Sequence, residues 1–245
     1  MENTDVAPAI SSTPALIAPL WHTAVVVIIL LGLSAMGAVT AHFQSGLNPA
    51  AAKTRIPSYV LTIVMEWLVL GIIGFGIRRR GVRIRDLIGG TWSPPVQALY
   101  DFGIAVAFLF AALVILGVLG RLLHATPNQA VRGLIPQTLP ETVLYLLLAL
   151  TAGFCEEIVF RGYLQRQFSA LTNSSHTGLV LQGLIFGAAH GYQGLRYMLM
   201  IAVYGCMFQL LAQWRRSLRP GIIAHFLQDG GVGLVARHST KLLCW

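Results

Sequence analysis

Charged residues are scarce in this chain. The 245 residues include only 17 Lys and Arg and 9 Asp and Glu, together 11% of the sequence, whereas a typical soluble domain has about 25%. Apolar residue types make up 56% of the chain. This number of charges is too small to cover a protein surface with water-binding side chains. A soluble globular protein is therefore excluded. The high apolar content also excludes an intrinsically disordered chain.

Cysteine is rare as well. The chain has three cysteines, Cys155, Cys206 and Cys244. They lack the short paired spacing that is typical of zinc sites, and three cysteines do not make a disulfide framework. We therefore expect them to be small residues of the core.

The chain instead contains long stretches without Asp, Glu, Lys or Arg, the longest of which runs from Val6 to Ala52. A helix needs about 20 mainly apolar residues to cross a bilayer. The sequence predicts an all-α, polytopic transmembrane helical bundle with about seven spans. The predicted spans are 20–41, 57–77, 97–119, 142–162, 177–192, 196–214 and 220–236.

Basic residues beside the spans predict the orientation of the bundle, because cytoplasmic loops are enriched in Lys and Arg. With seven spans, ten basic residues fall on one side and seven on the other, which favours a cytoplasmic N-terminus in the cell membrane. The ten are Arg78, Arg79, Arg80, Arg83, Arg85, Arg161, Arg166, Arg215, Arg216 and Arg219. We expect arginines at the span ends to contact membrane lipids. No nucleic-acid partner is expected, because no stacking aromatic residues are interleaved with a basic groove.

Four regions are expected along the chain. A loop from about 120 to 141, which contains Pro127, Pro136 and Pro140, separates two chemically different halves. The regions are a flexible N-terminal tail at 1–19, anchor-like transmembrane helices at 20–140, a helical core at 141–236 and a C-terminal tail at 237–245.

Ionisable residues at membrane depth distinguish the second half. The predicted anchor-like region carries Glu66 inside a span, whereas the core carries Glu156, Glu157, Arg161, His190, His225 and Asp229. Such groups are costly in the bilayer unless they are paired or wetted. Six of them in neighbouring spans predict a polar chamber used for chemistry or transport.

Glu156, Glu157 and Arg161 form the first motif of this chamber. On a helix, Glu157 and Arg161 are four residues apart and share a face, so an ion pair would offset their desolvation. Glu156 is rotated by about 100° from Glu157 and is free to face the chamber as a general base. The alternative is that both glutamates are structural.

Two histidine motifs follow. Small residues precede His190 and allow close helix contact. His225 and Asp229 are four residues apart and lie on one face of a helix. In one role, Asp229 would fix the tautomer of His225. In the alternative role, His225 and Asp229 would both donate hydrogen bonds to an oxyanion, which requires a protonated Asp229. Zinc stays open as an alternative, because Glu156, His190 and His225 are suitable ligand types, although no His-Glu-x-x-His motif is present.

In this order, the three motifs resemble the CPBP family of intramembrane endopeptidases, which includes the CAAX prenyl proteases. The family pattern is Glu-Glu-x-x-x-Arg, then Phe-x-x-x-His, then His-x-x-x-Asn or Asp. Here it reads Glu156, Glu157 and Arg161, then Phe186 and His190, then His225 and Asp229. The resemblance covers about residues 141–233. Asp229 departs from the prenyl proteases, which have Asn at this position, but is an accepted residue in the wider family.

The resemblance implies glutamate-based peptide hydrolysis without an obligatory metal. The short distance of Glu156 and His225 from the predicted cytoplasmic ends of their spans predicts a site near the cytoplasmic leaflet. Glu156 and His190 would activate water, and His225 and the residue at 229 would stabilise the oxyanion. Glu157 and Arg161 would hold the site in shape. The expected partner is a peptide or protein substrate, with lipid modification of that substrate left open.

Other functional classes stay open. Because of Asp229, a non-catalytic membrane scaffold or immunity-type protein of the same fold is one alternative. Because Glu156, His190 and His225 are suitable zinc ligands, a zinc-dependent membrane metalloprotease is another. A small transporter with a proton relay ranks last, because the chain lacks the two-fold internal repeat common in such carriers.

Overall fold

The computed structural model describes residues 15–44, 54–126 and 128–238 of the chain. Every regular element in these ranges is a helix, which confirms the predicted all-α fold. Most of the predicted N-terminal tail and residues 239–245 lie outside the described residues, as do Lys53, Lys241 and Cys244. The elements are α1 (Leu20–Gln44), α2 (Ile56–Arg78), α3 (Ile84–Ile88), α4 (Val96–Leu122), α5 (Gln129–Gly133), α6 (Leu139–Glu156), η2 (Glu157–Leu164), α7 (Gln165–Thr172), α8 (Ser175–Ala189), η3 (Gly191–Gln193), α9 (Leu195–Arg215) and α10 (Arg219–His238).

Five helices in the described ranges are long and apolar enough to cross a bilayer. They are Leu20–Thr40, Ile56–Arg78, Val96–Leu122, Leu139–Thr172 and Leu195–Arg215. The chain is therefore a multi-pass membrane protein. The fourth helix extends beyond the predicted span 142–162, because α6, η2 and α7 continue without a break.

The other two predicted spans are helical but fall outside these five. The helix α8 has 15 residues and is about 22 Å long, which is shorter than the roughly 30 Å hydrocarbon core. The helix α10 has 20 residues but includes Arg219, His225 and Asp229, which lower its hydropathy. Each of these helices also buries a polar side chain inside the bundle, Gln182 of α8 and His225 of α10.

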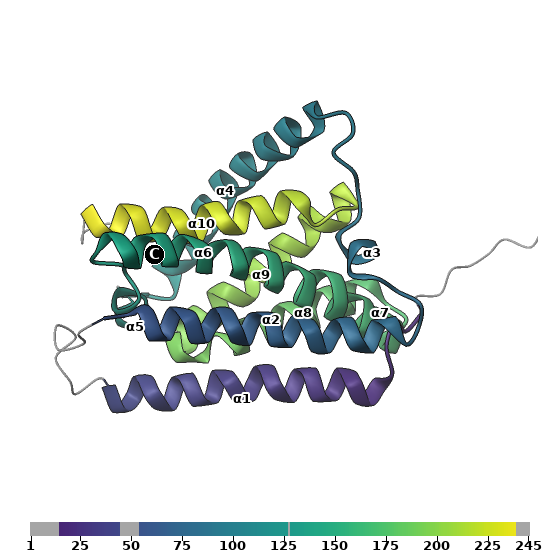
Figure 1. Cartoon of the computed structure of the whole chain (residues 1–245), viewed down its shortest axis with the longest axis horizontal. Coiled ribbons are helices and arrows are strands. Elements are labelled where there is room, and N and C mark those ends of the chain that lie inside the picture. The colour runs from purple at the N-terminus through teal and green to yellow at the C-terminus, as the bar shows by residue number, and fades with distance from the viewer. Residues whose placement is uncertain (1–14, 45–53, 127, 239–245) are drawn as a thin grey trace, which may run out of the picture.

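The helices α1, α2, α6 and α10 run nearly parallel in the view of Figure 1, and α9 crosses behind them. The helix α6 packs against α2 on one side and α10 on the other, while α8 packs against α7 and α9. The helix α4 contacts α9 and α10 and leans away from the other helices. This arrangement places η2, the segment that follows α6, at the centre of the bundle.

Glycines allow the closest helix crossings. A Cβ at Gly183 of α8 would lie 2.9 Å from the Ala202 carbonyl oxygen of α9, and one at Gly205 would lie 3.2 Å from the Gly183 Cα. A Cβ at Gly153 of α6 would lie 3.0 Å from the Phe226 backbone nitrogen of α10. A Cβ at Gly187, three residues before His190, would lie 2.9 Å from the Ala202 Cβ of α9, which confirms the close contact expected from the small residues before His190.

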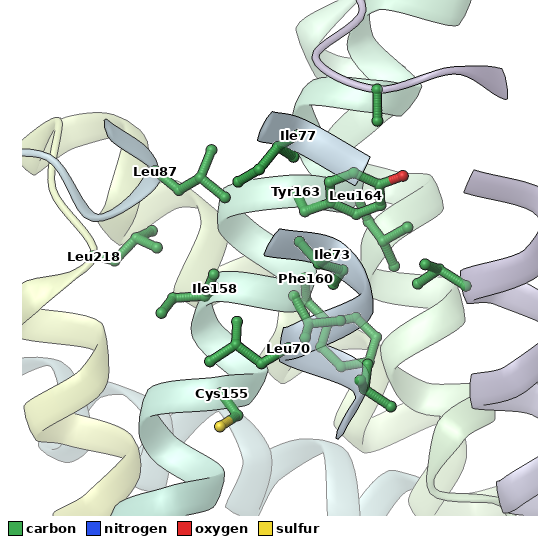
Figure 2. Close-up of a cluster of buried hydrophobic side chains, with 14 of the residues drawn as sticks. Leu70, Ile73, Ile77, Leu87, Cys155, Ile158, Phe160, Tyr163, Leu164 and Leu218 are labelled. Atoms are coloured by element: carbon green, nitrogen blue, oxygen red, sulfur yellow. The ribbon is translucent and has the colours of Figure 1, made fainter. Parts of the chain in front are cut away.

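The largest apolar cluster surrounds η2 (Figure 2). Leu70, Ile73 and Ile77 of α2 face Ile158 and neighbouring residues of the α6–η2 segment. Leu87 and Leu218 pack against η2 on another side. Because these side chains come from four parts of the chain, they fix the position of η2.

Polar contacts attach α1 to the α6–α7 helix. The Tyr163 hydroxyl lies 2.7 Å from His22 Nδ1, and His22 Nε2 lies 2.9 Å from the Ile72 carbonyl oxygen. The carbonyl can only accept, so Nε2–H donates to it and Tyr163 donates to Nδ1. Gln167 accepts from the backbone N–H of Ile17 at 2.9 Å. These bonds hold α1 where apolar contacts in lipid give little driving force.

Arginine-rich segments meet at one end of the bundle. Arg166 Nη2 donates to the Asp86 carbonyl oxygen at 2.9 Å, and the Leu218 N–H donates to the Ile88 carbonyl oxygen at 2.8 Å. The two arginine-rich loops and Arg166 therefore lie together, as predicted. Arg161 does not belong to this surface group, because its side chain is fully buried inside the bundle.

Candidate active site

Elements from all parts of the core bring the predicted residues together. Glu156 is the last residue of α6, and Glu157 and Arg161 lie in η2. His190 directly follows α8, while His225 and Asp229 belong to α10. One local prediction was wrong, because η2 is a π-helix where a regular α-helix was expected. Such wide turns are often found at functional sites.

Glu157 and Arg161 form the most deeply buried part of the site. Arg161 Nη1 lies 3.2 Å from Glu157 Oε1, and both side chains have 0% exposure. The Arg161 guanidinium carbon lies 4.1 Å from the ring centre of Phe186 and 4.9 Å from that of Phe208. The predicted ion pair is present, and the aromatic faces stabilise its cation through cation–π interactions.

His225 lies between three carboxyl groups. Its Nδ1 is 3.2 Å from Glu157 Oε1, while its Nε2 is 3.7 Å from Glu156 Oε2 and 3.6 Å from Asp229 Oδ2. An ionised carboxylate can only accept, so Nδ1–H donates to Glu157. Glu157 therefore fixes the tautomer of His225, a role that the sequence left open for Asp229. The Nε2 atom faces Glu156 and Asp229 beyond hydrogen-bonding distance.

His190 is held by its own helix. Its Nδ1 lies 2.8 Å from the Phe186 carbonyl oxygen, which can only accept. A neutral His190 therefore has its proton on Nδ1 and a free lone pair on Nε2. Its ring centre is 4.8 Å from that of Phe186, and the Phe186 ring centre is 6.3 Å from that of His225. Phe186 thus packs edge-on against both histidines and sets their separation.

Glu66 of α2 joins this cluster. Its carboxyl group makes a side-chain hydrogen bond with Glu156 and interacts electrostatically with His225 and Asp229. A hydrogen bond between two carboxyl groups needs a proton on one of them. The sequence predicts that Glu66 lies inside a span but does not predict that it belongs to the site. No motif identifies it, because its contact with Glu156 arises from the packing of α2 on α6.

Exposure divides the cluster into a buried and an accessible part. The Glu156 side chain is 15% exposed and that of Asp229 is 38% exposed, whereas His225 is 7% exposed. Glu157 lies fully buried behind them. Of the three carboxylates within 3.7 Å of the His225 ring, Glu156 and Asp229 can therefore contact a substrate or water, whereas Glu157 cannot.

Among the described residues, no group of three or more His, Cys, Asp and Glu side chains is arranged to hold a metal ion. Cys155 is buried and Cys206 is half-buried, and both are free thiols. Cys155 belongs to the apolar cluster around η2, as expected for a small core residue.

Residues 137–231 match the protein family described as type II CAAX prenyl endopeptidase Rce1-like. The matched segment begins just before α6 and ends within α10, so it contains every residue of the three motifs. The resemblance noted in the sequence is thereby confirmed over these residues. Neither a curated protein nor a solved structure matches the chain.

Proposed function

We propose that this protein is an intramembrane endopeptidase in which Glu156 and His190 activate a water molecule that cleaves a peptide bond. The observation that carries the proposal is that Glu156 and Asp229 each have a carboxylate oxygen within 3.7 Å of His225 Nε2. The match of residues 137–231 to a family of CAAX-type proteases supports it.

Glu156 is suited to be the general base. Its carboxylate is partly exposed, while Glu157 is occupied by Arg161 and His225. In the proposed reaction, Glu156 takes a proton from water as the water oxygen attacks the carbonyl carbon of the substrate. The free lone pair on His190 Nε2 accepts a hydrogen bond from the same water.

His225 is suited to stabilise the oxyanion. When its ring is protonated, Nε2–H can donate to the developing negative charge, and Glu157 balances the positive charge from the opposite side of the ring. Asp229 lies beside Nε2 and donates as well when it carries a proton. The C–N bond then breaks as the proton held by Glu156 passes to the leaving nitrogen, which yields a carboxylic acid and an amine and leaves Glu156 ionised again. The carboxylic acid then loses its proton to water or to the amine.

The expected substrate is a peptide or protein, and the CAAX-type match makes a lipid-modified protein one class to test. We place the reaction near the cytoplasmic leaflet of the cell membrane, on the basis of the arginine-rich end of the bundle. Zinc is not required for any of these steps.

Peptide cleavage in water enriched in oxygen-18 tests this proposal. The purified full-length protein is incubated with C-terminal and membrane-proximal peptides, with and without lipid modification. We expect one oxygen-18 atom in each new carboxyl group, unchanged by a zinc chelator and lost in Glu156→Gln. Loss of cleavage on chelation and its recovery with zinc would instead support a zinc metalloprotease.

A non-catalytic scaffold gives a different result. If the cellular function of the protein survives with Glu156 and His190 both changed to Ala, and no peptide is cleaved, the cluster serves binding and the proposed chemistry is wrong. Asp229, which replaces the Asn of the prenyl proteases, is the feature that motivates this second test.

A further inference from the structure

A cavity lies beside Arg161, the ion-pair partner of Glu157. Its volume is about 510 Å³, within the range of small-molecule sites, and its lining includes Arg161, Gln165, Arg166, Gln209, Arg216 and Ser217. We call it the Arg161 cavity. Because Arg166 and Ser217 belong to the arginine-rich end of the bundle, the cavity lies where lipid headgroups meet the protein.

Several buried polar atoms around this cavity lack a partner. Within the described part of the chain, Arg161 Nε and Nη2 have no hydrogen-bond acceptor, although Arg161 is only 2% exposed. The side-chain oxygens of Gln165 and Gln209 have no donor, at 5% and 3% exposure. Buried polar groups in folded proteins almost always have a partner. These atoms therefore indicate that a polar ligand or ordered water fills the cavity.

The charge of the lining selects the kind of ligand. Among the residues that the structure describes, three arginines and no carboxylate line the cavity. Guanidinium groups prefer carboxylate and phosphate oxygens, to which they donate paired hydrogen bonds. The unpaired oxygens of Gln165 and Gln209 need hydrogen-bond donors, which a bare anion does not supply but a hydroxyl group does.

We infer that the Arg161 cavity binds an anionic phosphate ester that carries hydroxyl groups, such as the headgroup of a glycerol-type phospholipid. The phosphate would lie against Arg161, Arg166 and Arg216, and the hydroxyl groups would donate to Gln165 and Gln209. This inference goes beyond the proposed peptide hydrolysis and does not depend on it. Binding would nevertheless stabilise the Arg161 side chain that supports Glu157.

Lipid titration of the purified full-length protein, followed by native mass spectrometry, tests the inference. Phosphatidylglycerol supplies both phosphate and hydroxyl groups, whereas phosphatidylcholine has no hydroxyl group and no net charge. We expect about tenfold tighter binding of phosphatidylglycerol, because hydrogen bonds to charged groups are among the stronger ones. Competition by soluble glycerol 1-phosphate would show that the free phosphate ester is also a ligand, whereas its failure to compete would assign the site to the lipid.

Three variants separate this site from general attraction of lipid to basic residues. Gln209→Leu removes a hydrogen-bond acceptor without changing charge, and exposed Arg166→Gln removes one charge from the cavity. Arg80→Gln is the matched control, because Arg80 is exposed at the same end of the bundle and does not line the cavity. We expect the first two to weaken phosphatidylglycerol binding and the control to leave it unchanged.

Equal binding of the two lipids would overturn the inference, and so would equal losses in Arg166→Gln and Arg80→Gln. Either result would mean that water fills the cavity or that the lipid binds only to the basic surface. Because the readout is lipid binding, failure of the proposed peptidase activity would not affect the outcome.

Discussion

Glu66 and Glu156 come from different halves of the sequence and meet through a hydrogen bond at the site. We expect Glu66→Gln to keep cleavage close to the wild-type rate, because the amide can donate to the Glu156 carboxylate. We expect Glu66→Leu to lower kcat/KM about tenfold, because it leaves one side of Glu156 without a partner. The measurement is peptide cleavage by the purified variants.

Met65→Leu is the control for the Glu66 variants, because it changes a neighbouring half-buried residue of the same helix. If Glu66→Leu and Met65→Leu cleave equally fast, Glu66 has no part in the reaction. If both Glu66 variants lose activity equally, the proton and not the hydrogen bond is what matters.

The proposed role of Asp229 as a hydrogen-bond donor can be tested by two substitutions. Asn donates a hydrogen bond without needing a proton, so an oxyanion donor at this position predicts that Asp229→Asn keeps or raises kcat. Asp229→Leu removes the donor and is expected to lower kcat by about 100-fold. A large loss in Asp229→Asn would show instead that the negative charge beside His225 Nε2 is required.

At the scale of helices, the crossing of α6 and α10 sets the distance between Glu156 and His225. A methyl group at Gly153 would lie 3.4 Å from the His225 Cβ and 3.2 Å from the Ile222 carbonyl oxygen. We therefore expect Gly153→Ala to separate the helices and lower kcat more than it raises KM. The comparison is steady-state cleavage with Gly231→Ala, whose added methyl group meets nothing within 4 Å.

Gly231→Ala is expected to retain full activity and to gain up to about 1 kcal/mol of helix stability. Equal activity in the two glycine variants would contradict a role for the α6–α10 crossing in positioning the site.

The attachment of α1 gives a prediction for stability. Tyr163→Phe leaves His22 Nδ1 without its donor inside the bundle, which costs about 1–3 kcal/mol. We expect a lower melting temperature in detergent than for Tyr100→Phe, which changes an exposed tyrosine. An unchanged melting temperature would mean that apolar contacts alone hold α1.

The helices themselves could be predicted from the sequence, because long charge-free runs have few alternatives in a membrane protein. The ion pair of Glu157 with Arg161 could also be predicted, since four-residue spacing brings the side chains together. The π-helix could not, because the residues that surround it, including Leu87, Leu218 and side chains of α2, come from distant parts of the chain. The contact of Glu66 with Glu156 was missed for the same reason.

The arginine-rich end of the bundle predicts the orientation of the whole protein in the membrane. We expect Cys at position 80 to be protected from a membrane-impermeant maleimide in intact cells, and Cys at position 121 to be labelled. Wild type gives the background from the native cysteines, and lysed cells show that both positions can react. Labelling of Arg80→Cys alone in intact cells would place the arginine-rich end outside and contradict a cytoplasmic site.

The central claim is that Glu156 is the base of a hydrolytic site built by the three motifs. The most direct measurement is the single-turnover cleavage rate of Glu156→Gln, which keeps the size of the side chain but cannot accept the proton from water. The account predicts a rate at least about 100-fold below wild type, with the protein folded and its melting temperature preserved. Cleavage at the wild-type rate by a folded Glu156→Gln variant would contradict it.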